Sequence, residues 1–421
     1  MQRNPVLVGL IFLIFFVISL LTNILGPIIP DIINSFQLSL TAAALLPFSF
    51  FIAYGVMSIP AGMLIEVYKE KPVILVSFLV GFGGAFCFAL FPLYGVAISS
   101  LFVIGIGMAM LQVAINPLLR VAGGEEHYAF NSTFAQVIFG AASFISPQIY
   151  SYLVQNLRAP AAPGNWLIGV LSRFVPVELP WVSVYWIFAT ITLLMVIGIF
   201  FFRFPVVQRT AEEQTGTWET HYLLFKKPLV WLYFISIFAY VGSEQGTANW
   251  ISQFLSTYHH IDPQTTGADA VSWFWGLMTI GCLLGMVLLK LIDSRRVLIG
   301  FTAAALICLG VGLFGPARAA LLAFPMMGFF LSVMWPVIFS LALNSVSEHH
   351  GSFSGILCSA IIGGAVVPLI IGRIGDFLGL RSGMLFLYPT LGWIFAVGFW
   401  ARPLVVNETI QSKKQKSNSD L

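Results

Sequence analysis

Charged residues are scarce in this chain: they make up 9% of its 421 residues, whereas 58% are hydrophobic. Soluble domains carry about a quarter of charged residues, so the composition excludes an ordinary soluble protein and indicates a polytopic membrane protein. The net charge of +3 is not gathered into any basic patch of the kind that binds nucleic acid. We therefore expect the lipid bilayer, and no nucleic acid, as a partner.

Cysteine is also rare. The four cysteines, Cys87, Cys282, Cys308 and Cys358, all fall in apolar runs and lack metal-ligand spacing, which argues against a disulfide framework or a metal site. We expect them to be small buried hydrophobic residues. The chain also lacks a nucleophile–base set, a phosphate-binding loop and a metal cluster, so we expect neither an enzyme nor a cofactor.

What the chain does have is a series of apolar runs, each long enough to cross a bilayer as a helix. The expected spans are residues 5–31, 41–66, 72–93, 94–119, 129–155, 181–203, 229–255, 269–292, 297–315, 318–343, 352–379 and 383–402. The predicted fold class is an all-α membrane protein with twelve transmembrane helices. An even number of spans places both termini on one side of the membrane.

The loop charges predict which side this is. If the termini are cytoplasmic, only five of the 20 Lys and Arg residues lie outside, namely Arg158, Arg173, Arg318, Arg373 and Arg381. Because cytoplasmic loops carry the excess of positive charge, we expect both termini in the cytoplasm. The compact layout and low cysteine content suit a bacterial inner membrane.

A polar loop divides the spans six and six. The expected domains are a first half at 1–203, a cytoplasmic linker at 204–228, a second half at 229–403 and a disordered tail at 404–421. The halves also echo each other, because a helical glycine followed by acid and base residues comes after spans two and eight. These residues, Glu66 and Lys69 in one copy and Asp293, Arg295 and Arg296 in the other, are expected to act as an inner gate or as helix caps.

The most unusual stretch is Tyr240–Trp250 within span seven. It contains Glu244, the only acidic residue well inside an apolar run. An ionisable group at membrane depth is costly and marks a substrate or ion path. At 100° per residue, Gln245 and Asn249 share one helix face, and Glu244 borders it. The alternative is a protonated glutamic acid bonded to a neighbouring helix.

Other midspan carboxamides and aromatics suggest a wet cavity that binds a sugar, whose hydroxyls need amides or carboxylates and whose ring face needs aromatics. The candidate binding residues are Asn23, Gln112, Asn116, Asn131, Gln136, Gln245, Asn249, Trp250 and Trp335. Simpler roles stay open. Asn23 and Asn116 could bond backbone groups freed by the prolines that follow, the glutamines could join helices, and the tryptophans could pack.

Several of these stretches resemble one family of the major facilitator superfamily, the fucose–galactose–glucose:proton symporters. The matching segments are Ser58–Gly62, Leu111–Pro117, Phe139–Pro147, Tyr240–Glu244, Trp335–Ala342, Gly351–Gly355 and Gly363–Pro368. The resemblance implies two pseudo-symmetric six-helix halves around a midplane site. It also implies alternating-access transport of a monosaccharide coupled to a cation.

The chain departs from that family at its coupling residues. The L-fucose member has an Asp in span one and a Glu in span four, and the matching positions are Asn23 and Gln112. The family's Gln and Asn of span five align with Phe134 and Val137, although Asn131 and Gln136 lie nearby. The resemblance therefore supports the fold and the substrate class, but it does not predict the coupling ion.

The resulting prediction is a monomeric monosaccharide symporter that uses Na⁺ or H⁺, with Glu244 as the ion-coupling residue. A carboxylate with neighbouring carbonyl and amide oxygens suits Na⁺, and a carboxyl group that gains and loses a proton suits H⁺. Alternatives are a sugar facilitator without ion coupling and, with less support, a metabolite or drug exporter. A receptor on the same fold would need a long signalling tail, and an exporter a more apolar cavity.

Overall fold

The computed structural model describes residues 5–123, 128–158, 165–202, 204, 218–346 and 349–402. Within these ranges the secondary structure is helical, without strands. Eleven described helices are long and apolar enough to cross a membrane. The remaining expected span is α10 (Pro228–Ala248) with α11 (Ile251–His259), which carries the polar stretch around Glu244. Together these elements account for the twelve membrane spans that the sequence predicts.

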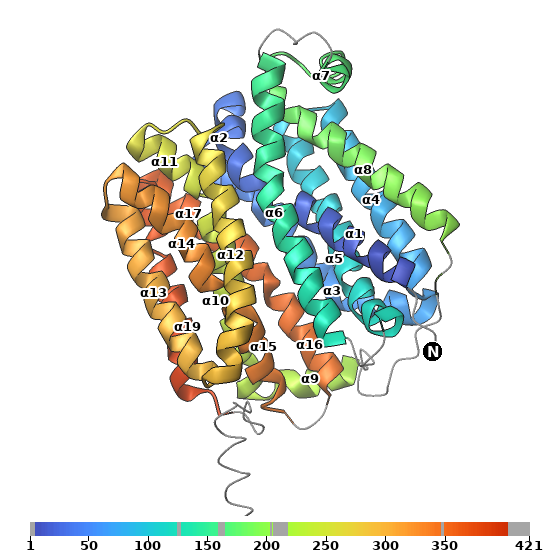
Figure 1. The fold of residues 1–421 in the computed structure, drawn as a ribbon, viewed down its shortest axis with the longest axis vertical. Helices are drawn as coiled ribbons and strands as arrows, with labels where there is room; N and C mark the ends of the chain where they lie inside the picture. Colours follow the sequence, from blue (N-terminus) through green and yellow to red (C-terminus); the bar gives the residue numbers. More distant parts are fainter. Residues whose placement is uncertain are drawn as a thin grey trace, which may run out of the picture.

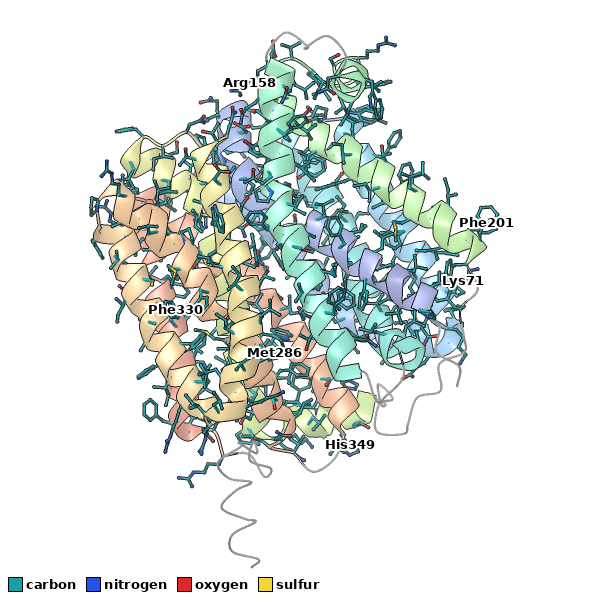
Figure 2. All side chains as sticks on the ribbon, viewed as in Figure 1. Lys71, Arg158, Phe201, Met286, Phe330 and His349 are labelled. Carbon is teal, nitrogen blue, oxygen red and sulfur yellow. The ribbon has the colours of Figure 1, made fainter. Side chains whose placement is uncertain are left out.

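The first half begins with span one, which is divided into two helices. Its elements are α1 (Pro5–Thr22), α2 (Leu25–Phe36), α3 (Leu40–Tyr68), α4 (Glu70–Leu90), α5 (Tyr94–Gly123), α6 (Tyr128–Arg158), the short α7 (Trp166–Leu171), η2 (Pro180–Val182) and α8 (Ser183–Phe201). The Lys71 ammonium group donates to the Phe200 and Phe202 carbonyl oxygens at 2.9 and 2.6 Å. This contact ties the start of α4 to the end of α8 (Figure 2).

The second half repeats this layout. Besides α10 and α11 it contains α12 (Thr266–Leu291), α13 (Ser294–Phe314), α14 (Ala317–Leu331), α15 (Met334–Leu343), α16 (His350–Ser359), η4 (Ala360–Ile362), α17 (Gly363–Leu378), α18 (Leu380–Met384) and α19 (Leu387–Trp400). Part of the expected linker is helical, as α9 (Trp218–Phe225). Residues 205–217 of that linker, residue 403 and the whole expected tail, 404–421, lie outside the described ranges.

Two hydrophobic cores fill the bundle, one built mainly from the first six spans and the other mainly from the last six. The halves meet most extensively where α3 packs on α17 and α6 on α12, and also where α2 packs on α11 and α12. Helices α6 and α12 run beside each other through the middle of the bundle (Figure 1). Ile29, Ala43 and Ala44 of the first half belong to the second core, and Ala268 and Ala365 of the second half belong to the first. The halves are therefore in tight contact along these pairs.

The first span of each half is broken at an asparagine. Pro27 has no N–H to donate to the carbonyl oxygen of Asn23, four residues earlier, and the helix stops at Thr22 and restarts at Leu25. In span seven α10 stops at Ala248 and α11 restarts at Ile251, with a tightened turn in which Trp250 N donates to Thr247 O at 3.1 Å. Asn23 and Asn249 thus occupy equivalent positions in the two halves.

We call one end of the bundle outer and the other inner, following the orientation that the loop charges predict. The outer end carries α7, the start of α3 and the end of α6; the inner end carries α9 and the start of α16 (Figure 1).

Candidate functional site

The break in span one is a buried polar cluster. The Asn23 side chain is 5% exposed, and its Nδ2 donates to Ser143 Oγ on α6 at 2.8 Å. Ser143 Oγ also lies 2.7 Å from Ser19 Oγ. The Asn23 Oδ1 atom has no hydrogen-bond partner among the described residues. Since buried acceptors are nearly always bonded, this oxygen is a ready acceptor for a hydroxyl group.

The break in span seven is built in the same way. Asn249 is 3% exposed, and its Nδ2 is a buried donor without a partner among the described residues. One turn earlier, Gln245 is also buried. A Cβ placed on Gly364 would lie 3.2 Å from both Gln245 Cγ and Phe51 Cδ1. The Gln245 side chain therefore lies where α10, α17 and α3 of the other half meet.

The two breaks lie side by side. A Cβ on Gly26 of α2 would clash with the Ala248 carbonyl oxygen and would lie 3.5 Å from the Asn249 Cα atom. Only a residue without a side chain allows this close approach. The contact places the unpaired acceptor of Asn23 and the unpaired donor of Asn249 in the same central layer of the bundle, one from each half.

Next to this layer, Glu244 lies among aromatic side chains. Tyr240, one turn earlier on α10, is a hydrogen-bond partner of Glu244, and its ring centroid is 6.0 Å from that of Trp335 on α15. Trp335 in turn stacks on Phe339 at 5.7 Å with an interplanar angle of 21°. Glu244 and Trp335 are both half-buried. Tyr240 therefore links the Glu244 carboxyl group to the stacked rings of Trp335 and Phe339.

Trp250, by contrast, is completely buried. Its exposed fraction is 0%, and its indole Nε1 donates to the Pro368 carbonyl oxygen of α17 at 3.3 Å. The structure places this side chain in the packing between α10/α11 and α17. Trp275 of α12 is also buried, at 3% exposed, and its Nε1 has no partner among the described residues.

The four carboxamides of spans four and five are more accessible. Gln112 is half-buried and Asn116 is exposed, and Asn116 Nδ2 donates to the Gln112 carbonyl oxygen at 3.0 Å. Gln136 is exposed and shares a helix face with Gly140 and Ser143. A Cβ on Gly140 would clash with Thr279 of α12, so this face looks towards both α1 and the second half.

Asn131 points elsewhere. A Cβ on Gly123 of α5 would clash with Asn131 Nδ2, so the structure brings Asn131 against the end of α5. At 100° per residue it falls on the side of α6 opposite Gln136. The structure thus brings Asn23, Gln245, Asn249 and the Glu244 aromatic cluster into one central region, and it leaves Asn131 apart from them.

The residues expected to gate the inner end make local contacts. Lys69 is exposed, ends α3 with a φ of 68°, and its Nζ donates to the Glu66 carbonyl oxygen at 3.4 Å. Asp293 Oδ1 caps α13 by accepting from Arg295 N at 3.0 Å and from Arg295 Nε at 3.4 Å.

Arg295 Nη1 reaches the Ala401 carbonyl oxygen, in the same half, at 3.5 Å. Arg296 and the Glu66 side chain are exposed. The contacts of Lys69, Asp293 and Arg295 fit helix caps, which was the alternative role that the sequence left open.

Asp31, a buried acid of the first span, was not singled out in the sequence analysis. Asp31 is 6% exposed and lies inside α2, which continues to Phe36, so Glu244 is not the only acid within a span. The expected span ended at residue 31, which made Asp31 look like a boundary residue. Its partners, Tyr150 and Gln264, come from α6 and from the loop before α12, and sequence spacing gives no signal for them.

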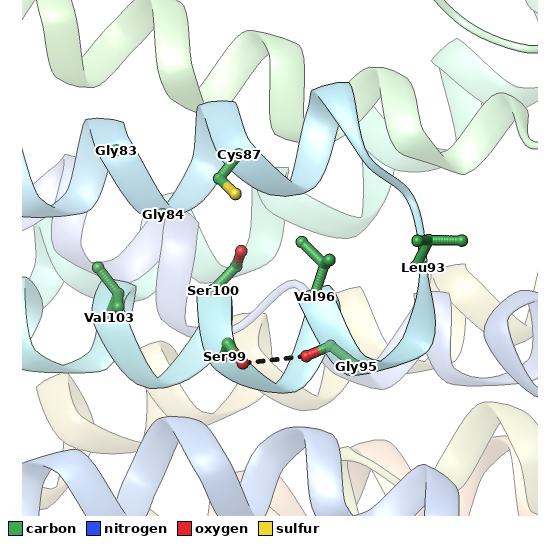
Figure 3. Close-up of a pocket in the computed structure, with 9 residues that line it drawn as sticks. All are labelled: Gly83, Gly84, Cys87, Leu93, Gly95, Val96, Ser99, Ser100 and Val103. Carbon is green, nitrogen blue, oxygen red and sulfur yellow. Dashed lines mark hydrogen bonds between the residues drawn. The ribbon is translucent and has the colours of Figure 1, made fainter.

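A pocket of about 520 Å³ lies away from this central region, between α4 and α5. Its lining includes Gly83, Cys87, Leu93 and Ser99, which are exposed, and Figure 3 shows the Ser99 hydroxyl directed back to its own helix at the Gly95 carbonyl oxygen. The pocket contains none of the predicted site residues. We therefore do not assign it to the candidate site.

Comparison with known proteins agrees with the fold. A family model described as Major Facilitator Superfamily matches residues 11–361. A glucose/galactose transporter of Brucella abortus is 30% identical over 397 residues, which cover 91% of this chain and 90% of that protein. An L-fucose-proton symporter of Escherichia coli is 25% identical over 385 residues, covering 87% and 86%.

Among solved structures, the chain is similar to a crystal structure of the E. coli fucose:proton symporter. The TM-score is 0.67 at 21% sequence identity, and the match covers 95% of this chain and 100% of that one. At this identity the similarity concerns the fold, which is the same two-half bundle of membrane helices.

Proposed function

The chain belongs to the Major Facilitator Superfamily, a family of transporters and not of enzymes, and from this premise we propose that it imports a monosaccharide by symport with a cation. The sugar would bind at the centre of the bundle and be released on the opposite side when the halves rock. The named glucose/galactose and L-fucose transporters among its relatives support a hexose or a related sugar as substrate.

The observation that carries this proposal is the cluster of Glu244, Tyr240 and Trp335 beside buried carboxamides. Pyranose sugars have hydroxyls in the ring plane and C–H groups on the ring faces. The stacked Trp335 and Phe339 rings offer a surface for a C–H face, and Tyr240, which contacts Trp335, is hydrogen-bonded to Glu244. The unpaired Asn23 Oδ1 and Asn249 Nδ2 atoms then offer an acceptor and a donor for further hydroxyls.

Glu244 is the residue to which we assign ion coupling. It is half-buried within a membrane span, where a charge is costly unless a cation or a proton neutralises it. Binding of Na⁺ or H⁺ at this carboxyl group would remove that cost while the sugar is bound beside it. The two ligands would then favour each other's binding, which is the energetic requirement for symport.

A facilitator without ion coupling is the second candidate. It is favoured by Asn23 and Gln112, which stand where the related L-fucose transporter family has its acids. Because amides do not titrate, these two positions do not contribute a proton path. The two candidates differ in one observable, which is accumulation of sugar against its own gradient.

Counterflow in proteoliposomes tests sugar transport separately from coupling. Vesicles loaded with unlabelled D-glucose should take up labelled D-glucose transiently, and D-galactose, D-mannose, L-fucose or N-acetylglucosamine outside should compete if they are substrates. Inhibition by one of these sugars would name the substrate. If folded protein gives no counterflow with any of them, the sugar class is wrong.

Trp335→Ala is expected to weaken sugar binding. Removing the ring takes away the apolar surface that Trp335 forms with Phe339, and we expect the KM for sugar to rise about tenfold, equivalent to ~1.4 kcal/mol of binding free energy. Trp335→Phe should recover most of the affinity. The measurement is the concentration dependence of counterflow.

The matched control is Trp166→Ala. Trp166 lies on α7 with 76% of its surface exposed, and its replacement should leave the KM unchanged. An unchanged KM in Trp335→Ala would place the sugar elsewhere in the bundle.

We also propose that the protein lies in a bacterial inner membrane, which its compact layout and low cysteine content suit, and that both termini are cytoplasmic, which its loop charges support. Reporter fusions test this orientation. A reporter that is active only in the cytoplasm should be active after residue 402 and inactive within the outer loop that precedes η2. The reverse pattern would invert the labels inner and outer used above.

A further inference from the structure

Three sets of hydrogen bonds between the described residues join the two halves at the outer end of the bundle. The first set surrounds Asp31 of α2. Its Oδ2 accepts from the Tyr150 hydroxyl of α6 at 2.7 Å, and its Oδ1 accepts from Gln264 Nε2 of the second half, also at 2.7 Å. The carboxylate is thus held by one donor from each half, at a site where Tyr150 is fully buried.

Gln264 lies in the loop before α12, and a second hydrogen bond joins this loop to the first half. Ser151 Oγ of α6 donates to the Gln264 carbonyl oxygen at 2.6 Å. Asp31, Ser151 and Gln264 are all at least nine-tenths buried. The side chain and the backbone of Gln264 are therefore both bound to the first half, and neither set of bonds survives if the outer ends separate.

The second set joins α6 to α12. Gln148 Nε2 donates to Asp269 Oδ1 at 2.7 Å and lies 3.1 Å from Ser272 Oγ. Asp269 is in the first turn of α12 and its side chain is exposed. Here the carboxylate belongs to the second half and the donor to the first.

The third set joins α17 to the beginning of α3. Asp376 Oδ1 accepts from Leu40 N at 2.7 Å, and its Oδ2 accepts from Thr41 N at 3.0 Å and from the Thr41 hydroxyl. The free N–H groups at a helix start carry partial positive charge and bind a carboxylate. A residue of one half therefore acts as the cap of a membrane helix of the other.

The packing around Asp376 supports this contact. A Cβ on Gly372 would lie 2.7 Å from the Leu40 carbonyl oxygen, and one on Gly375 would lie 2.8 Å from Leu40 Cδ1. Both glycines are on α17; Gly372 lies four residues before Asp376 and Gly375 lies one residue before it. They let the start of α3 sit directly on α17, so that the carboxylate reaches its backbone.

We propose that Asp31, Asp269 and Asp376 form an outer gate, in which each carboxylate holds a donor of the opposite half and keeps the transporter closed to the outside. The structure is then the outward-closed state, and entry of substrate from outside requires all three contacts to open. Each donor and each carboxylate is hydrated on opening, so protein hydrogen bonds are exchanged for water hydrogen bonds and the net cost stays modest. A gate of this kind can open and close in every cycle.

The proposal needs alternating access and does not depend on the identity of the substrate. It also assigns gating to residues other than the inner-end set of Glu66, Lys69, Asp293, Arg295 and Arg296. Among these, the bonds of Asp293 lie within its own half. Asp293 therefore offers a carboxylate cap of similar chemistry that does not cross the interface.

Distances between spin labels test the gate in the full-length protein. One label pair, at Asn34 on α2 and Thr266 on α12, reports the outer end, and a second, at Val67 on α3 and Leu291 on α12, reports the inner end. All four positions are exposed. Cys87, Cys282, Cys308 and Cys358 are replaced by serine or alanine first, and counterflow confirms that this background is folded and active.

Asp31→Asn and Asp376→Asn should each raise the ratio of outward-open to outward-closed protein about threefold to tenfold, because a charge-assisted bond across the halves becomes a neutral one. The outer pair should lengthen and the inner pair shorten. Asp293→Asn is the matched control and should leave both distributions unchanged.

Variants of the donors provide a second, independent measurement. Gln264→Leu and Gln148→Leu keep the carboxylates and remove their partners, and both should shift the outer distance in the same direction. Unchanged outer distances in all four variants, in protein that remains monodisperse, would overturn the gate. A shift as large in Asp293→Asn would overturn it too, because the effect would then not belong to the interface.

Discussion

Glu244→Gln is expected to abolish accumulation of sugar against its gradient while counterflow persists. Glutamine keeps the size of the side chain and its ability to bond with Tyr240, but it neither takes up a proton nor offers a negative charge to Na⁺. If the carboxyl group couples the cation to the sugar, its loss removes the mutual stabilisation of the two ligands. We expect the accumulation ratio to fall to equilibrium and the counterflow rate to change by less than about tenfold.

The control for this experiment is Glu178→Gln. Glu178 is an exposed carboxylate in the segment before η2, outside the spans, and the same substitution there should leave accumulation intact. Full accumulation in Glu244→Gln would contradict the coupling role. Glu244 would then have only a structural role, as a side chain hydrogen-bonded within the bundle. Loss of both accumulation and counterflow would show that Glu244 is needed to bind the sugar itself.

Gly26→Ala is expected to block the closure of the outer end. The added methyl group meets the Ala248 carbonyl oxygen at the point where the two broken helices touch. Overpacking of this kind costs about 1–3 kcal/mol, and because the contact exists only when the outer ends are together, the cost falls on the outward-closed state. The transport rate should drop by about tenfold or more, and the outward-open population should rise.

The effect should be specific to this position in the span. Gly9, in the same span, has no atom within 4 Å of an added Cβ, so Gly9→Ala should transport as the parent protein does. The spin-label pair at the outer end measures the populations directly. Equal rates for Gly26→Ala and the parent protein would show that the close contact of the two helix breaks is not part of the cycle.

The fold was predictable because its signal is strong. Apolar runs of span length and the asymmetry of Lys and Arg are properties of composition, and the structure places helices at each predicted span. The helix breaks were less visible. Pro27 gives a local reason for the break at Asn23. No proline lies near Asn249, so the sequence does not predict the second break. The structure shows that this break contacts the first one, through Gly26 and the Ala248 carbonyl oxygen.

The candidate site was predictable in part, because carboxamides and a carboxylate within apolar runs stand out against their surroundings. What sequence could not supply is their partners. The suggestion that Asn23 bonds freed backbone gives way in the structure to a bond from its Nδ2 to Ser143, 120 residues away. Gln245 and Trp250 lie five residues apart in the same polar stretch. Only packing distinguishes Gln245, which lies where the halves meet, from Trp250, which is buried against Pro368.

The outer gate was invisible for the same reason. Asp31 and Gln264 are separated by 233 residues. Asp376 accepts from the backbone N–H of Leu40, a donor that every residue type except proline presents. The internal repeat drew attention to the inner ends of spans two and eight, because repeated residues can be read from a sequence. Each contact of the outer gate pairs a residue of one half with a residue of another type in the other half. Such pairs do not repeat along the chain, so the sequence shows no pattern for them.

The most direct test of the account is uptake of labelled D-glucose into proteoliposomes under an imposed gradient of Na⁺ or of H⁺, with D-galactose, D-mannose, L-fucose and N-acetylglucosamine as competitors. The account predicts accumulation above equilibrium, driven by one of the two ions and lost when that gradient is collapsed. Uptake that only equilibrates and ignores both gradients would contradict cation coupling. It would make the protein a facilitator with the same fold.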